Sequence, residues 1–215
     1  MRRLLFCIAL AACGTPDPLL PPPVGFPEAR LTEVYANGRP KAMRAGWRAA
    51  ADGIENTASG LRCPEEAGGG RGAEEADDVL RLASAVSYVP DGSDASCTYA
   101  APRAGAVVTV YATIAALSGA AFLADGEAAI AARYPGAEAI SLRGSDLPGF
   151  VGGSAYALPA GTDGKTYDRV TAIWVASQGD RHVKVRATYP AARAYAETQA
   201  ERVLRAAARD VQGTD

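Results

Sequence analysis

One stretch of the sequence, RHVKVRATYP at 181–190, places basic side chains at every second position. His182, Lys184 and Arg186 alternate with valines, which is the spacing of a strand whose successive side chains point to opposite faces. Three potentially cationic groups on one face would form a stripe that can hold a phosphate, a carboxylate or the acidic surface of a partner. The competing interpretation is a solvated sheet face on which these groups form ion pairs across strands.

His182, the single histidine of the chain, could also act as a general base in a hydrolase. Ser177 is the nearest serine in sequence, and Asp180 lies two residues before the histidine, but no Gly-x-Ser-x-Gly motif surrounds the serine. The sequence therefore predicts no catalytic residue, and we expect His182 to be a solvent-facing histidine on a strand. An envelope hydrolase stays as an alternative, which a cleft joining His182 to a serine and a carboxylate would support.

The acidic and glycine-rich stretches do not match a metal or phosphate site. Asp91, Ser93 and Asp94 superficially suggest a calcium loop, yet the glycine and the distal glutamate of the EF-hand pattern are absent, so we expect a polar hairpin turn. The motif GGGRG lacks the Gly-Lys-Ser/Thr ending of a phosphate-binding loop. We expect no metal and no cofactor.

Two cysteines in the body of the chain, Cys63 and Cys97, are candidates for a disulfide. Such a pair is expected to form in an oxidising compartment outside the cytoplasm. Closing a loop of this length is worth about 3 to 4 kcal/mol in the chain-entropy account of disulfides. The alternative is that both cysteines are buried free thiols. A metal site is not expected, because two cysteines and the single histidine supply too few ligands. The pairing thus depends on export from the cytoplasm.

The N-terminus has the three parts of an export signal. Arg2 and Arg3 supply positive charge, residues 4–10 are apolar, and two alanines supply the small residues before a cleavage site. The apolar part is far shorter than the roughly 20 residues that cross a bilayer as a helix, so we expect no membrane-spanning segment. An ordinary secretory signal, in which Cys13 is incidental, and a buried N-terminal helix are the alternatives.

The leader ends on the quartet Leu10-Ala11-Ala12-Cys13. This quartet resembles the lipobox of bacterial lipoproteins. The resemblance implies that residues 1–12 are a signal peptide and that Cys13 becomes the mature N-terminus, carrying a thioether-linked diacylglycerol and often a third acyl chain. One acyl chain holds a protein to a bilayer only marginally, at about 0.8 kcal/mol per buried methylene, whereas two or three anchor it stably. The resemblance therefore implies a membrane partner bound through lipid at Cys13.

Residues 13–27 continue from the lipidation site as a proline-rich tether. Six prolines in this segment favour an extended polyproline-II conformation, at about 3.1 Å per residue, which gives a length on the order of 40 Å. Such a tether would lift a folded domain clear of the lipid headgroups. Gly14 stands where an aspartate marks lipoproteins of some bacteria for the inner membrane, so the resemblance favours the outer membrane, with the domain in the periplasm.

Charge and composition favour a single globular domain over residues 28–215. Without Arg2 and Arg3, the 22 basic residues fall to 20 against 24 acidic ones, a net charge of −4. This mild acidity argues against a nucleic-acid partner, which calls for a basic excess. The hydrophobic fraction of 48% is enough for a core, and the aromatic fraction of 7% predicts that small side chains build it.

Helical spacing predicts four helices. Residues 28–53 form a helical N-terminal part with helices over 28–37 and 40–52, for which Pro40 suits the first position and Gly53 the C-terminal cap. A third helix covers 118–134 with Ser118 as its cap, and an amphipathic helix covers 191–211.

Strand signals fill most of the remaining chain. Alternating or β-branched segments bounded by turn residues predict strands at 54–64, 79–89, 96–102, 106–113, 136–144, 152–160, 167–177 and 181–190. Short connections imply antiparallel neighbours, and Gln178-Gly179-Asp180 predicts a tight hairpin between the last two strands.

This order of elements predicts an α+β fold: one antiparallel sheet, in a single domain, with helices packed on one face. The order is similar to that of PsbP-like α+β domains of lumenal and periplasmic proteins, although no motif accompanies it. Such a fold does not by itself imply an activity. We expect a non-enzymatic envelope lipoprotein that binds a protein or an envelope component. Besides the hydrolase, the alternative is a carrier of an apolar ligand, which predicts an enclosed pocket between sheet and helices.

Overall fold

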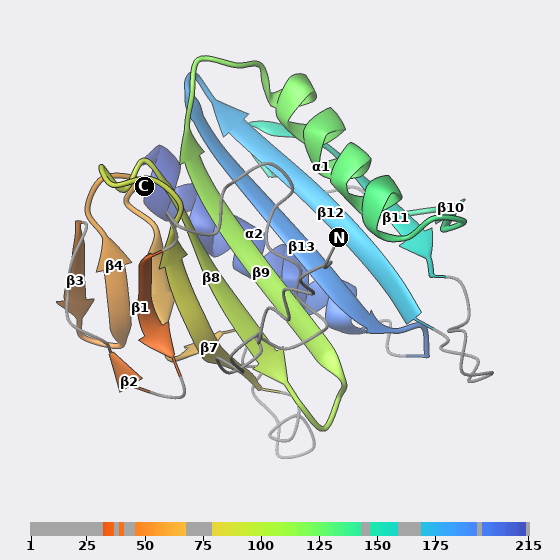
Figure 1. The fold of residues 1–215 in the computed structure, drawn as a ribbon, viewed down its shortest axis with the longest axis horizontal. Helices are drawn as coiled ribbons and strands as arrows, with labels where there is room; N and C mark the ends of the chain where they lie inside the picture. The colour runs from red at the N-terminus through yellow and green to blue at the C-terminus, as the bar shows by residue number, and fades with distance from the viewer. Residues whose placement is uncertain are drawn as a thin grey trace, which may run out of the picture.

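The computed structural model of the protein describes most of the chain after residue 31. The described ranges are 32–36, 39–40, 46–67, 79–142, 147–158, 169–192 and 195–213, with only the backbone given for 32–36, 39–40 and Tyr195. They form a ten-stranded sheet, a three-stranded sheet and two helices (Figure 1). No helix among them is long and apolar enough to cross a membrane. The predicted signal peptide 1–12 and tether 13–27 lie outside the described residues.

The ten strands of the large sheet run in the order β10-β11-β12-β13-β9-β8-β7-β1-β2, with β6 paired to β7. Their bounds are β1 Thr32–Ala36, β2 Arg39–Pro40, β6 Glu66–Ala67, β7 Leu80–Ser87, β8 Asp94–Ala101, β9 Ala106–Ile114, β10 Glu138–Ile140, β11 Phe150–Ala157, β12 Arg169–Gln178 and β13 Arg181–Pro190. The small sheet contains β3 Trp47–Ala50, β4 Gly53–Asn56 and β5 Arg62–Pro64. The helices are α1 Gly119–Arg133 and α2 Tyr195–Gln212.

The large sheet consists of two antiparallel meanders that meet along one strand pair. Strands β7 to β9 form the first meander and β10 to β13 the second, and β13 pairs with β9 between them. The hairpin between β12 and β13 turns at Gly179, whose φ of +62° lies in the left-handed region that glycine adopts readily. The predicted antiparallel sheet is thus confirmed, in a chain that has more strand than a balanced α+β domain.

The predicted helical N-terminal part, residues 28–53, is wrong in every range that the structure describes. Strand β1 pairs with β7, and β3 pairs with β4, so backbone hydrogen bonds to other strands override the local preference of alanine-rich sequence for a helix. Gly53 is a strand residue of β4 and not a helix cap. Glycine is needed there because a side chain would overlap the backbone of Cys63. Trp47 is buried and donates its indole N–H to Ser87 of β7 at 2.7 Å.

The two helices cover opposite faces of the large sheet (Figure 1). Helix α1 packs on the face that carries Ile173 and Lys184, since both side chains approach Gly126 of that helix. Helix α2 packs on the other face, where Tyr189 donates a hydrogen bond to Glu197 at 2.7 Å. Lys184 and Tyr189 differ by an odd number of positions in one strand and therefore point to opposite faces. The prediction that helices cover a single face is wrong.

The connections explain this arrangement. Helix α1 carries the chain from β9 across one face to β10 at the far edge, whereas α2 follows β13 and returns along the other side. We call the two sides the α1 face and the α2 face. Helix α1 begins where predicted, because the Ser118 hydroxyl accepts a hydrogen bond from the backbone N–H of Ala121 at 3.2 Å.

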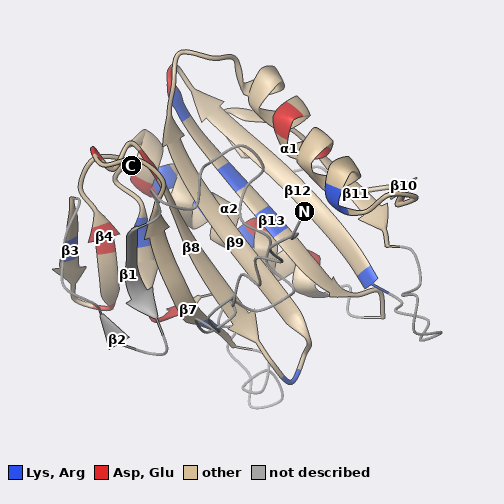
Figure 2. Ribbon diagram, viewed as in Figure 1, with Lys and Arg blue, Asp and Glu red and all other residues tan. Residues whose placement is uncertain are grey.

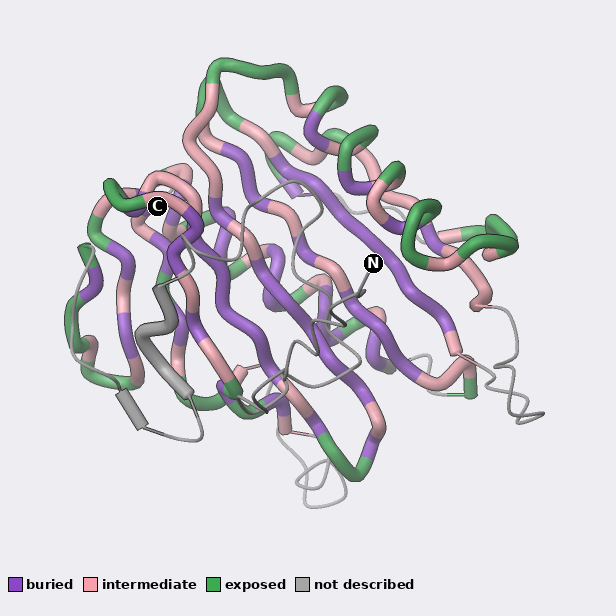
Figure 3. Tube along the Cα trace, in the orientation of Figure 1, coloured by how far each residue is buried: buried purple, intermediate pink, exposed green. Residues whose placement is uncertain are grey.

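The main hydrophobic core lies on the α2 face. It combines Trp174 and Val185 of the sheet with Ala200, Leu204 and Ala207 of α2, all buried. Small alanine side chains let α2 approach the strands closely, as the composition predicts. Figure 3 shows the central strands mostly buried and the outer side of α1 exposed.

Candidate functional site

The predicted cysteine pair lies where the two sheets meet. Cys63 of β5 and Cys97 of β8 are fully buried, and their Cα atoms are 6.0 Å apart with the sulfur atoms at disulfide distance. This geometry is consistent with the predicted disulfide. A bond here connects the small sheet to the large one. Cys13, the predicted lipidation site, lies outside the described residues.

His182 is fully buried on the α1 face and forms two hydrogen bonds. Its Nε2 lies 3.1 Å from the backbone carbonyl oxygen of Ala115. A carbonyl can only accept, so Nε2 carries the proton and Nδ1 accepts from the Ser177 hydroxyl at 2.8 Å. The ring of Phe122 from α1 covers the imidazole at 5.2 Å between ring centroids.

This arrangement joins only two of the three groups that the hydrolase alternative requires. The serine and the histidine meet because they are directly opposite each other in the β12–β13 hairpin. The third position is occupied by the carbonyl of Ala115 instead of a carboxylate. His182 has 0% exposure, so the expectation of a solvent-facing histidine is wrong, and substrate has no access to the imidazole in this structure. The hydrogen bonds therefore anchor the hairpin to the loop before α1.

Lys184 and Arg186 lie on the same face as His182, against aromatic rings. The Lys184 Nζ atom is 4.8 Å from the ring centroid of Tyr111 and 4.7 Å from that of Phe122. The Arg186 guanidinium is 5.7 Å from the ring centroid of Tyr134. Such distances allow cation–π attraction. Burial lowers the pKa of Lys184, while the carboxylates of Asp125 and Asp94 act in the opposite direction.

The predicted basic stripe is present, but it is not exposed to solvent as expected. His182, Lys184 and Arg186 share one face, as their alternation predicts, and Figure 2 shows the basic residues along β13. That face is not a solvated surface, because α1 and its aromatic rings pack over this part of the sheet. One member is buried and the other two are partly buried. A phosphate or an acidic partner cannot reach the three together.

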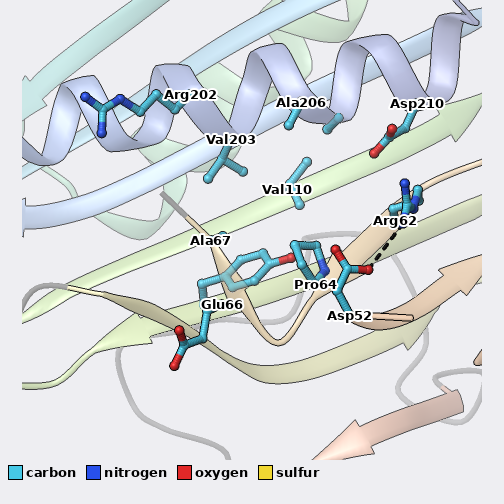
Figure 4. A pocket seen from close by; sticks show the side chains of 12 residues that line it. Asp52, Arg62, Pro64, Glu66, Ala67, Val110, Arg202, Val203, Ala206 and Asp210 are labelled. Atoms are coloured by element: carbon cyan, nitrogen blue, oxygen red, sulfur yellow. Dashed lines mark hydrogen bonds and ion pairs between the residues drawn. The ribbon is translucent and has the colours of Figure 1, made fainter. Parts of the chain in front are cut away.

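A cavity of about 290 Å³ lies on the α2 face, between α2 and the segment that contains β5 and β6 (Figure 4). We call it the α2 cavity. Its apolar lining includes Val110 of β9 and Val203 and Ala207 of α2. Charged side chains complete the lining, so the cavity does not match the enclosed apolar pocket expected of a carrier of apolar ligands.

The charged groups of the α2 cavity are unevenly placed. Asp52, Arg62 and Asp210 gather at one end, while Glu66 and Arg202 lie toward the other (Figure 4). Arg62 forms an ion pair with Asp52 at 3.2 Å. Burial raises the pKa of Asp210, although the nearby charge of Arg62 acts in the opposite direction. One end of the cavity thus has two carboxylates for one guanidinium.

Tyr99 of β8 also lines the α2 cavity and is 1% exposed. No side chain or backbone group in the described part of the chain forms a hydrogen bond with its hydroxyl. Burial raises the pKa of this hydroxyl, and the charges of Asp52 and Asp210 raise it further. The hydroxyl is therefore close to both carboxylates and remains able to donate and accept hydrogen bonds.

The cysteine pair borders the α2 cavity. Cys63 lies between Arg62 and Pro64, which both line the cavity, and Cys97 is two residues from Tyr99 on the same face of β8. A disulfide would hold the cavity wall at β5 against its floor at β8. No group of three or more histidine, cysteine or acidic side chains within the described ranges could hold a metal ion.

The sequence carries little signal for this cavity. Asp52, Tyr99 and Asp210 come from a turn, a strand and a helix that are far apart in the chain. Asp52 and Arg62 are ten positions apart in the chain and are brought together by the β3–β4–β5 meander. Comparison with known proteins found no matching family model, no matching curated protein and no matching solved structure. The ligand chemistry of the α2 cavity is therefore inferred from the positions of its lining residues.

Proposed function

We propose that this protein is a lipid-anchored component of the bacterial cell envelope whose domain binds an envelope component at the α2 cavity. The leader quartet ending at Cys13 supports the anchor, and the tether 13–27 supports display of the domain away from the membrane. The outer membrane is the favoured location, with the domain in the periplasm. Binding, without catalysis, is the proposed activity.

The α2 cavity beside the cysteine pair is the observation that carries this proposal. A cavity with charged groups at its ends and an apolar middle is the usual form of a small-ligand site. A disulfide persists in oxidising compartments such as the periplasm, so a wall held by Cys63 and Cys97 suits a protein that works there. The Cys63/Cys97 pair therefore supports both the proposed periplasmic location and the proposed binding site beside it.

Lipid anchoring is tested by substitution of Cys13 in a bacterium grown with a fatty-acid analogue. We expect Cys13→Ser to abolish labelling and to release the protein from the membrane fraction. Cys7→Ser is the matched control, because Cys7 lies in the predicted signal peptide and should leave labelling unchanged. Persistent labelling of the Cys13→Ser protein would contradict the anchor.

Binding at the α2 cavity is tested by a photo-cross-linking amino acid in intact cells. Position 66 borders the cavity, whereas position 91 is in the turn at the opposite end of β7. We expect an envelope component to be captured from position 66 and not from position 91. Equal capture from both positions, or capture from neither, would contradict binding at this cavity.

A further inference from the structure

The acidic end of the α2 cavity has one carboxylate without a direct positive partner. Arg62 pairs with Asp52 at 3.2 Å, and no described residue forms an ion pair with Asp210. Asp210 is partly buried, and burial is the main cause that raises the pKa of its carboxyl. A positive group that entered the cavity here would replace water at this carboxylate and would favour its charged form.

The Tyr99 hydroxyl is a second group at the same end that lacks a partner. It belongs to a side chain that is 1% exposed, lines the cavity, and feels the charges of both Asp52 and Asp210. Because Tyr99 lines the cavity, its hydroxyl can form a hydrogen bond with a group that enters there. An N–H donor placed between the carboxylates could also donate to the tyrosine oxygen, and the tyrosine O–H could then donate to a carboxylate.

The middle of the cavity is apolar. Val110 from the sheet and Val203, Ala206 and Ala207 from α2 line it. These side chains cannot form hydrogen bonds, so they favour a hydrocarbon part of a ligand over a polyol or a second charge. The volume of about 290 Å³ limits that part to a small body.

The balance of charge argues against an anionic ligand. The cavity lining contains three carboxylates, those of Asp52, Glu66 and Asp210, and two guanidinium groups. The Arg62 guanidinium is already paired with Asp52, and Arg202 lies toward the other end with Glu66 (Figure 4). An anion at the Tyr99 end would therefore face two carboxylates, and like charges at short range repel.

We infer that the α2 cavity binds a small organic cation, with a primary ammonium group between Asp52, Asp210 and the Tyr99 hydroxyl and an apolar body against the valine and alanine side chains. The inference rests on the proposed function in one respect, the choice of this cavity as the binding site. It adds the class of ligand. An envelope component that carries a free amine is the kind of molecule that fits.

The test uses n-hexylamine as the probe and isothermal titration calorimetry with the full exported protein in detergent. Two molecules of the same length, n-hexanol and hexanoate, separate the contribution of charge from that of the apolar body. We expect hexylamine to bind at least tenfold more tightly than hexanol and hexanoate not to bind. Equal binding of hexanol, or preferential binding of hexanoate, would overturn the inference.

Variants locate the probe within the cavity. Asp210→Asn should weaken hexylamine binding at least tenfold, because it removes the unpaired charge from a partly exposed position that folding tolerates. Tyr99→Phe should weaken binding several-fold. Asp91→Asn, in an exposed turn remote from the cavity, is the matched control and should have no effect. Unchanged affinity of the Asp210→Asn protein overturns the inference.

The two proposals fail in distinguishable ways. If hexylamine does not bind while position 66 still captures an envelope component in cells, the cavity is the binding site and the ligand is not a cation of this class. If position 66 captures nothing, binding at this cavity fails as a function, and tight hexylamine binding that depends on Asp210 would still support the chemistry of the cavity.

Discussion

The two faces of the large sheet are covered by helices that pack in different ways. On the α2 face, contacts are mainly apolar, between residues such as Trp174, Val185 and Leu204. On the α1 face, the strands present buried polar groups, and α1 approaches them through a glycine, Gly126, and a ring, Phe122. Apolar packing is non-directional, whereas each buried polar group needs a partner in one place.

The difference indicates separate roles for the two faces. The α2 face supplies most of the apolar burial and contains the α2 cavity, so its side chains stabilise the fold and offer a place for a ligand. The α1 face fixes the position of its helix through specific contacts, among them a hydrogen bond from the Ser154 hydroxyl to Glu127. On the same face of the sheet, buried hydroxyl pairs at 3.1 Å, Thr98 with Thr109 and Thr171 with Thr188, connect neighbouring strands to each other.

The largest effect is expected from removing the cysteine pair on the α2 side. The double variant Cys63→Ala/Cys97→Ala should lower the free energy of unfolding by about 3–4 kcal/mol, because the bridge spans 34 positions and restricts the unfolded chain. Urea denaturation measures the change. Reduced wild-type protein should unfold at the same urea concentration as the double variant. A midpoint that does not respond to reductant, or two alkylatable thiols in the exported protein, would contradict a disulfide at this place.

A smaller effect is expected from filling the close approach on the α1 side. Gly126→Val should destabilise the protein by about 2–3 kcal/mol, since the added atoms would overlap Ile173 and press on Lys184. Thermal unfolding measures the change. Ala128→Val, at an exposed position of the same helix, should cost only about 0.5 kcal/mol through helix propensity. Equal costs for the two variants would show that α1 does not pack as described.

A third effect concerns the hydrogen bonds of His182. Ser177→Ala removes the donor to Nδ1 and should lower the free energy of unfolding by about 1–2 kcal/mol, because it leaves a buried nitrogen without a partner. Chemical denaturation at neutral pH measures it. The neighbouring exposed variant Gln178→Ala should be nearly neutral. If Ser177→Ala leaves the free energy of unfolding unchanged, the hydrogen bond between Ser177 and His182 stabilises the fold no more than hydrogen bonds to water do.

The smallest effect is expected at Lys184, where a substitution should stabilise the protein instead of destabilising it. Burial lowers the pKa of Lys184 from its ordinary 10.5, so folding favours the neutral amine. The stability linked to this group is present above pH 10.5 and is lost as the pH falls through the lowered pKa. Lys184→Met keeps the contacts with the rings of Tyr111 and Phe122 and should be more stable than wild type at pH 7.

The control for this variant is pH itself. The advantage of Lys184→Met should disappear above about pH 10.5, where lysine is neutral in both the folded and the unfolded protein. Denaturation curves of both proteins at pH 7 and at this higher pH test the sign. If Lys184→Met destabilises at pH 7 and not at high pH, the charge of Lys184 stabilises the α1 face.

Most of the sheet could be predicted from the sequence because its signals are local. Alternating residues and turn residues mark β7 to β9 and β11 to β13, and Gln178-Gly179-Asp180 predicts the hairpin that turns at Gly179. The cap at Ser118 marks the start of α1. The cysteine pair could be predicted from the small number of cysteines, although its partners lie in different sheets.

The remaining features depend on long-range packing. Residues 46–53 are rich in alanine and contain strands because they pair with neighbours that local sequence does not specify. Alternation in β13 predicts which residues share a face with His182, but the side that α1 covers depends on the path of the chain. The α2 cavity joins Tyr99 to Asp210 through tertiary structure alone. The lipid anchor at Cys13 stays a prediction from sequence.

The late position of α2 has a consequence for biosynthesis. Residues 195–212 follow every strand of the large sheet, so a nascent chain has all its strands before the helix that covers Trp174 and Val185. Burial of apolar surface is the dominant favourable term in folding. On the α2 face, this burial cannot be completed before α2 has been synthesised. The order of elements therefore leaves this apolar surface of the sheet uncovered until the last helix has been synthesised.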